Sequence, residues 1–423
     1  MEKISILSLS LILVSTYSVS AALPGMVGYF KDYSRTEVEQ LISIPSFAIM
    51  IMVLLNTKLS VWIRERVSIT LGLLLLVAGG SAPMFIRQYE LMFAARVLMG
   101  IGIGLINTYA ITMINERYDG RERAALLGIR GSAEVLGNAV LTLIAGKLLL
   151  HGWSKAFAVY LAGLPVLFLY LTFVPERSRR SPKERAERSP LGRRTERSSL
   201  GEMAACPSID EGAERRDFGE EAKSQSVRES TVHQSRGKSD ISFLLGCGLM
   251  GSMMICMNSG ITMRIPGLVL ERGLGTEGDA SVVLSVMLVA GMVGGLGFGR
   301  LTELLGRRMM AVLMLVLGAG LAIISNAGTI WMLGAGAAAA GMADSLLVTV
   351  QFHRVSTRLP EGRMTFGTTC VLVGCNLGAS MSPHILRLID SFGGKSGTVF
   401  LVFAVFALLL GAVFSGWMAK ERI

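Results

Sequence analysis

A few ionisable side chains stand inside long apolar runs of the sequence, where a charge is costly. Asp344 lies in a stretch rich in alanine and glycine, and it is the sole acidic residue deep in an apolar segment of the second half. A carboxylate in such a place must be paired, hydrated or neutralised by a proton. Two interpretations follow. Asp344 takes up and releases a proton, or it pairs with an arginine or hydrogen-bonds to Ser345.

Glu134 and Arg96 are the corresponding candidates in the first half. Glu134 follows Arg130 by four residues, a spacing at which side chains of one helix form a local ion pair. It is also a second candidate for proton transfer. Arg96 interrupts an apolar run, so its side chain must face protein or water, or reach the membrane surface. Gly100 and Gly104 follow it one helical turn apart, which permits close helix packing.

The composition places these residues in a membrane protein. The 423-residue chain is 51% hydrophobic and 17% charged, with a mean hydropathy of +0.54, whereas globular chains carry about 25% charged residues. The net charge of +10 does not indicate nucleic acid, because the arginines lie between apolar segments, as retained cytoplasmic loops require. The bilayer is therefore the expected surrounding, and no nucleic-acid partner is expected.

Enzymatic chemistry finds no support in the sequence motifs. No HExxH, paired catalytic carboxylates or Gly-rich nucleotide loop is present, which argues against an enzyme and against ATP-driven transport. The five cysteines include no CxxC pair or Cys/His cluster. We expect no cofactor and no metal site.

Apolar runs of roughly 20 residues, enough to cross a bilayer as helix, recur along the whole chain. The expected segments are 4–23, 38–57, 68–86, 91–114, 124–146, 156–174, 241–263, 281–299, 309–327, 329–350, 364–387 and 397–418. Lysine and arginine are more frequent in the termini and alternate loops on the side of the N-terminus. That side is predicted to be cytoplasmic, with both termini inside.

The two halves of the chain repeat one another. Leu-Pro-Gly-Met-Val at 23–27 is echoed by Ile-Pro-Gly-Leu-Val at 265–269, an offset of 242 residues. Because the first segment has this counterpart, we expect it to be a retained helix and not a cleaved signal peptide. Residues 175–240 are polar, basic first and then acidic, and cannot bury enough apolar area to fold alone. They are predicted to be a disordered cytoplasmic loop between domains 1–174 and 241–423; binding of its basic part to anionic lipid is the alternative.

Residues 299–308 read Gly-x-Leu-x-Glu-x-x-Gly-Arg-Arg. This stretch resembles the loop signature of the major facilitator superfamily of secondary transporters, with Glu303 where the family usually has Asp. The spacing Arg96-x-x-x-Gly100-x-Gly102 is similar to the fourth-helix motif of that family, and Arg123 matches its gate arginine. The first-half loop at 58–66 has Val61 in the place of Glu303 and Arg64 in the place of Gly306, and the fifth segment has no proline. The resemblance therefore does not establish drug/proton antiport.

The resemblance implies an all-α protein with twelve transmembrane helices in two pseudo-symmetric six-helix bundles. It implies alternating access and a cavity lined by helices one, four, seven and ten. The polar candidates there are Ser15, Tyr17, Asn107, Tyr109, Asn258, Thr262 and Asp344. The gate candidates are Gly299, Glu303, Gly306, Arg307, Arg308 and Arg123.

The function expected from this resemblance is transport of a small, moderately hydrophobic organic solute by a monomer in the cell membrane. Proton-coupled efflux is favoured over metabolite uptake. A receptor or scaffold that keeps the fold without transporting is the alternative from another class.

Overall fold

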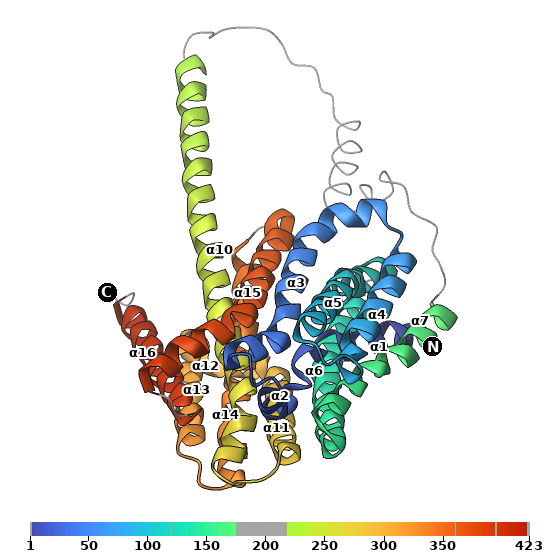
Figure 1. The fold of residues 1–423 in the computed structure, drawn as a ribbon. Coiled ribbons are helices and arrows are strands. Elements are labelled where there is room, and N and C mark those ends of the chain that lie inside the picture. Colours follow the sequence, from blue (N-terminus) through green and yellow to red (C-terminus); the bar gives the residue numbers. More distant parts are fainter. Residues whose placement is uncertain (1, 119, 175–217, 360, 394–395, 421–423) are drawn as a thin grey trace. The chain divides into compact units, whose positions relative to one another are not determined.

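The structure, a computed structural model, describes residues 2–118, 120–174, 218–359, 361–393 and 396–420. Within these ranges the ordered elements are all helices (Figure 1). The chain divides into two compact units, Met1–Val174 with Leu244–Ile423, and Pro175–Phe243. Residues 175–217 of the predicted central loop lie outside the described residues. The first unit holds every segment discussed below; we call its residues 2–174 the N-terminal half and its residues from 244 the C-terminal half.

The N-terminal half consists of long helices joined by short 3-10 turns. Its elements are α1 (Glu2–Leu13), η1 (Ser15–Tyr17), η2 (Ser20–Ala22), α2 (Leu23–Tyr29), α3 (Arg35–Trp62), α4 (Glu65–Ser81), η3 (Ala82–Met84), α5 (Tyr89–Arg117), α6 (Gly120–Leu148), η4 (Leu149–His151), η5 (Trp153–Ala162) and α7 (Gly163–Phe173).

The C-terminal half begins within a helix whose first residues belong to the other unit. Its elements are α10 (Phe218–Glu271), α11 (Glu277–Leu296), α12 (Phe298–Leu305), η6 (Gly306–Arg308), α13 (Met309–Ser325), α14 (Ile330–Arg358), α15 (Glu361–Gly393) and α16 (Ser396–Lys420).

The apolar helices match the twelve expected segments. Among the described residues, nine helices are long and apolar enough to cross a membrane, two bent pairs qualify when each is taken as one span, and one shorter apolar helix covers Gly397–Ala412. Each coincides with one expected segment. The prediction of an all-helical protein that crosses the membrane many times is confirmed.

The first segment is not the continuous helix that its hydropathy predicts. It breaks after α1 and bends by 44°. Serine and threonine compete with the helical backbone for hydrogen bonds, and here the Ser15 hydroxyl bonds the Ile12 carbonyl at 2.7 Å while that of Ser20 bonds the Tyr17 carbonyl at 2.7 Å. The break frees backbone carbonyls that other side chains then satisfy.

Helix caps support the internal repeat. Ser34 and Glu37 form a capping box at the start of α3, and Thr276 and Asp279 form one at the start of α11. The offset is 276 − 34 = 242 for the first pair and 279 − 37 = 242 for the second. The same reciprocal hydrogen bonds therefore stand at the start of the second membrane span of each half, α3 and α11. The repeat is not complete, because α10 continues through Pro266 whereas the first half breaks before Pro24.

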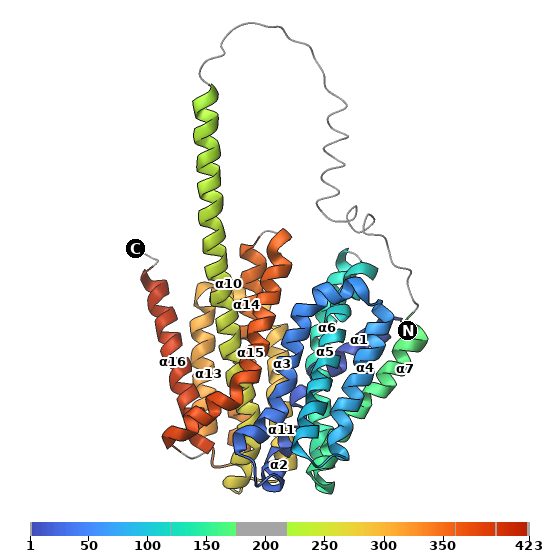
Figure 2. The same ribbon diagram turned by 45° about the horizontal axis from the view of Figure 1, so that its top comes forward.

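The two halves meet along two helix pairs, α3 with α15 and α6 with α11 (Figure 2). Small residues allow the close approach, since a side chain at Gly146 of α6 would collide with Ser281 of α11. Ser285 of α11 donates a hydrogen bond of 3.1 Å to the carbonyl of Ala139 on α6.

Candidate functional site

Asp344 of α14 faces Asn258 of α10. The Asn258 amide donates a hydrogen bond of 2.8 Å to Asp344 Oδ2. The residue is 3% exposed, and its second oxygen, Oδ1, is buried without a partner. Among the residues that the structure describes, Asp344 forms no ion pair, and its hydrogen-bond partner is Asn258 and not Ser345. The carboxyl group thus has one neutral donor and a free oxygen in a buried place.

Thr262 lies one turn beyond Asn258 on α10. Its hydroxyl donates to the Asn258 carbonyl at 2.8 Å, so it satisfies its own helix. Thr262 is therefore a second polar side chain near Asp344, but its hydroxyl proton is already donated to its own helix.

Arg96 of α5 is fully buried and acts as a clamp inside the N-terminal half. Its Nε donates to the Leu41 carbonyl at 2.7 Å, a group that would bond the N–H of residue 45 in a regular helix. Residue 45 is Pro45, which has no N–H to give. Nη2 donates to the Thr16 carbonyl at 2.9 Å, at the break of the first segment.

The aromatic residues of η5 complete the surroundings of Arg96. Nη1 contacts the Tyr160 hydroxyl at 3.0 Å, and that hydroxyl donates to the Ser15 carbonyl at 3.0 Å. The guanidinium lies over the rings of Phe157 and Tyr160. The side chain therefore neither reaches the membrane surface nor faces a carboxylate; it holds two interrupted helices.

Arg130 and Glu134 of α6 form the ion pair expected from their spacing, at 2.5 Å. Arg130 Nη2 also lies 3.4 Å from Asn107 Oδ1 on α5. The Arg130 side chain is 12% exposed and that of Glu134 is 19% exposed. Polar side chains of the fourth and fifth spans thus meet in a partly open place.

The remaining cavity candidates lie apart from this cluster. Ser15 is fully buried beside Arg96. Tyr109 is 7% exposed, and its hydroxyl lies 3.3 Å from the Ile63 carbonyl between α3 and α4. Tyr17 crosses between the halves and donates to the Ala379 carbonyl of α15 at 3.1 Å. Tyr17 thus links the two halves.

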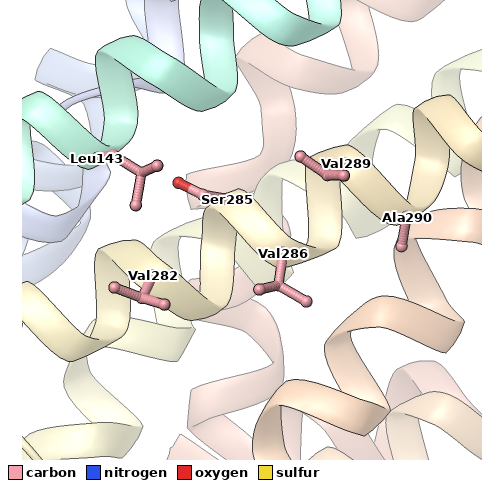
Figure 3. Close-up of a pocket in the computed structure, with 6 residues that line it drawn as sticks. All are labelled: Leu143, Val282, Ser285, Val286, Val289 and Ala290. Carbon is pink, nitrogen blue, oxygen red and sulfur yellow. The ribbon is translucent and has the colours of Figure 1, made fainter.

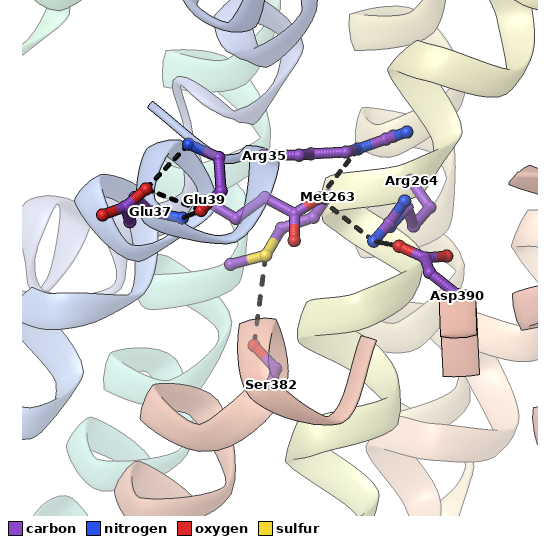
Figure 4. Close-up of polar contacts among 8 residues, drawn as sticks. Arg35, Glu37, Glu39, Met263, Arg264, Ser382 and Asp390 are labelled. Carbon is purple, nitrogen blue, oxygen red and sulfur yellow. Dashed lines mark hydrogen bonds and ion pairs between the residues drawn. The ribbon is translucent and has the colours of Figure 1, made fainter. Parts of the chain in front are cut away.

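A chain of four charges joins α3, α10 and α15 (Figure 4). Within α3, Arg35 Nε lies 3.1 Å from Glu39. Arg264 of α10 lies 3.3 Å from the same Glu39 oxygen and 2.6 Å from Asp390 of α15. The side chains of Glu39 and Arg264 are 0% and 2% exposed. This charge quartet (Arg35, Glu39, Arg264, Asp390) connects the two halves.

Sequence reasoning missed the quartet because each member stands near the end of an apolar run, where charges normally face water. Glu39 lies in the first turn of an expected segment and Asp390 just after one. Glu39 inside the segment 38–57 was the available signal. Beside the quartet, Gln40 Nε2 and His384 Nε2 lie 2.9 Å apart across the same two halves.

The signature stretch is a short helix and not a plain loop. α12 is followed by a bend of 113° into α13, and Gly306 has a φ of +47°, a backbone conformation that favours glycine. Gly299 lies inside α12 with open space around it. Glu303 and Arg308 are exposed. The side chains of Arg123 and Arg307 lie outside the described ones.

The glycines after Arg96 serve helix packing. A side chain at Gly100 would collide with the Pro45 carbonyl of α3, and one at Gly102 would meet the Gly72 carbonyl of α4. Both positions therefore bring α5 against its neighbours.

An apolar pocket of about 370 Å³ lies between α6 and α11 (Figure 3). Its lining is Leu143, Val282, Ser285, Val286, Val289 and Ala290. The Ser285 hydroxyl is engaged with backbone carbonyls. The pocket offers a hydrocarbon wall within two membrane spans and no free polar group, which suits a lipid chain better than a polar solute. No group of three metal-ligating side chains occurs among the described residues.

The model of the Major Facilitator Superfamily matches residues 6–302, more than half of the chain. The chain belongs to this superfamily. Membership in this superfamily agrees with the many apolar helices of the fold.

Curated relatives include Protein TsgA of Shigella boydii serotype 18 (strain CDC 3083-94 / BS512), 26% identical over 179 residues, which covers 40% of this chain and 46% of that protein. Protein TsgA of Escherichia coli O157:H7 (strain EC4115 / EHEC) is 25% identical over the same length and coverage. The match spans about half the length of these relatives.

Solved structures of superfamily transporters share the fold over nearly the whole chain. One is a POT family transporter in complex with a thioalcohol-conjugated peptide, with a TM-score of 0.68, 12% identity, and coverage of 99% of this chain and 96% of the other. Another is a mutant of the nucleoside transporter NupG, with a TM-score of 0.68, 13% identity, and coverage of 98% and 99%. At these identities the likeness shows the fold alone.

Proposed function

We propose that this superfamily member couples the movement of a small organic solute across the cell membrane to protons, in the direction of efflux. The observation that carries the proposal is Asp344, which is buried with one neutral donor and an oxygen without a partner. An ionised carboxylate in that place lacks the cation that would compensate its burial. A proton on Oδ1 removes the charge, so that Asp344 carries a proton while it is closed off from water.

Asn258 suits this role because its amide donates to the carboxyl group in either protonation state. It lies on α10 while Asp344 lies on α14. A movement of the two halves against each other changes the access of Asp344 to water and so the occupancy of its proton. This links proton transfer to the alternating-access cycle of the fold.

The conformation fits one state of that cycle. The quartet closes the halves at the end of the bundle that carries Arg35, where Glu39 is fully buried. At the signature stretch, by contrast, Glu303 is exposed and Leu304 is 81% exposed. With the N-terminus placed in the cytoplasm, as the distribution of basic residues predicts, the closed end faces outward. The quartet is therefore proposed to close the outward-facing end.

Flux into proteoliposomes with an imposed proton gradient tests the proposal. The probes are peptides, 5-aminolevulinic acid, nucleosides and a set of apolar drugs. The first three are chosen because transporters with this fold were solved in complex with a conjugated peptide and with 5-aminolevulinic acid, and because a nucleoside transporter shares the fold. Asp344→Asn should retain exchange of a probe between equal pools but lose its dependence on the gradient. Gradient-driven flux equal to the native chain in Asp344→Asn would overturn the assignment.

The matched control is Asp390→Asn. Asp390 is paired with Arg264 and partly exposed, so it is not expected to move a proton during the cycle. Solute that moves in the same direction as the protons indicates uptake, and solute that moves against them indicates efflux. Absence of flux for all probes would favour the receptor or scaffold.

A further inference from the structure

Arg130 leaves most of its hydrogen-bonding capacity open. A guanidinium carries five N–H donors. Among the described residues, only Nη2 of Arg130 has partners, Glu134 Oε1 at 2.5 Å and Asn107 Oδ1 at 3.4 Å. Nε is buried with no partner, and no contact to Nη1 occurs among the described residues. A buried N–H without a partner is uncommon in folded proteins and calls for an explanation.

Arg96, in the same half, shows what a structural arginine looks like in this protein. Its three nitrogens all have acceptors, among them the carbonyls of Leu41 and Thr16 and the hydroxyl of Tyr160. It is also fully buried, whereas the Arg130 side chain is 12% exposed. The two arginines therefore differ in how many of their nitrogens have hydrogen-bond partners and in how exposed their side chains are.

The Arg130–Glu134 pair is partly exposed inside a membrane span. The pair lies within the apolar span Gly128–His151, and charged groups inside a membrane face an aqueous path or other protein groups. Its neighbours are α5, through Asn107, and the first segment, because one turn further along α6 Asn138 accepts a hydrogen bond of 2.7 Å from Ser18. The pair thus faces the side of α6 where the first and fourth spans lie.

We propose that Arg130, positioned by Glu134 and Asn107, binds the carboxylate of the substrate, a small monocarboxylic acid with an apolar body. A hydrogen bond from a guanidinium to a carboxylate is assisted by both charges and is stronger than one to a neutral group. Glu134 occupies Nη2 and fixes the guanidinium, and Nε is buried, which leaves the N–H groups of Nη1 for the ligand. The mainly apolar segments around the pair suit the rest of such a molecule. This inference rests on the proposed transport function and names its substrate class.

Equilibrium binding to the purified full-length chain in detergent tests the inference without a membrane gradient. The probes are benzoate, phenylacetate and hexanoate, each compared with its primary amide, which has nearly the same shape without the charge. We expect at least one acid to bind about tenfold more tightly than its amide. The double variant Arg130→Gln with Glu134→Gln removes both charges, so that neither is left unpaired. In this variant the ratio of the affinities for acid and amide should fall to about one.

A second ion pair of the same half provides the matched control. Arg117 lies 3.0 Å from Glu65, and the pair is not part of the site. Arg117→Gln with Glu65→Gln should keep the preference for the acid, which excludes a general effect of losing a pair. A preference that persists in the Arg130 double variant, or acids and amides that all bind the native chain alike, would overturn the inference.

The same assay separates this inference from the proton proposal. Asp344→Asn should keep the preference for the acid, because no gradient is present. If flux shows that Asp344 is not needed for coupling while the acid preference depends on Arg130, only the coupling proposal fails. If coupling depends on Asp344 but the double variant binds acids as before, only the carboxylate site fails.

Discussion

At the scale of single residues, Arg96 replaces hydrogen bonds that the helices of the N-terminal half cannot make themselves. Pro45 leaves the Leu41 carbonyl without its helical donor, and the break of the first segment leaves that of Thr16 free. A buried carbonyl without a donor costs about 1–3 kcal/mol. One side chain therefore stabilises two irregular backbones at once.

Arg96→Gln should lower the thermal stability of the detergent-purified protein by several degrees, since glutamine cannot reach both carbonyls. Arg96→Lys should also fail, because a single ammonium does not span the positions of three guanidinium nitrogens. The control is Arg87→Gln, an exposed arginine over the rings of Tyr29 and Trp153. Equal unfolding temperatures for the Arg96 and Arg87 variants would show that the clamp does not stabilise the fold.

At the scale of elements, close helix packing depends on glycines at specific points of each half. Gly137 of α6 packs on the Leu11 carbonyl of α1, and Gly378 of α15 packs on the Ser252 carbonyl of α10. These are the first and fifth spans of each half, so the repeat extends to the way its helices touch. The physical reason is that only glycine lets two helix backbones come so near.

Gly137→Ala should destabilise the protein by about 1–3 kcal/mol, because the added methyl group forces α1 and α6 apart. Gly128→Ala on the same helix is the matched control. An added Cβ there meets no atom within 4 Å, so alanine should be neutral or slightly stabilising through its better helix propensity. Thermal unfolding of both variants measures the difference; similar shifts of the same sign would contradict the packing argument.

At the scale of the whole molecule, the charge quartet can separate into two ion pairs, one in each half. Arg35–Glu39 lies within the N-terminal half, Arg264–Asp390 lies within the C-terminal half, and of the three pairs only Glu39–Arg264 crosses. Separation of the halves at this end breaks one ion pair and leaves each charge with a partner. Opening therefore avoids the large cost of an unpaired buried charge.

Glu39→Gln should weaken closure at this end, because it removes the crossing pair of the quartet while Arg264 keeps Asp390. The reporter is cross-linking of Gln40→Cys to His384→Cys by a short bis-maleimide, at positions whose native side-chain nitrogens lie 2.9 Å apart, in a chain whose own cysteines are replaced by serine. The cross-linking rate should fall several-fold. Asp390→Asn, which keeps the crossing pair, should change it less, and equal rates in the two variants would rule out Glu39 as the latch.

The sequence by itself determined the number and place of the spans and the class of protein. The reason is that the hydropathy and length of a segment are local properties, and they decide whether it can cross the hydrocarbon core of a bilayer. It also determined the Arg130–Glu134 pair, since residues four apart on a helix must meet. The carboxylate at Asp344 was visible for the same reason, as an acid inside an apolar run.

Only the tertiary structure decided what these groups touch. The quartet joins residues 126 positions apart in the case of Arg264 and Asp390, and no local pattern specifies such a partner. The role of Arg96 depended on carbonyls freed by a proline on one helix and by a break in another. For Asp344, the position inside an apolar run showed that its carboxylate is costly to bury. The packing of α10 against α14 decided that its neighbour is an amide and not a cation.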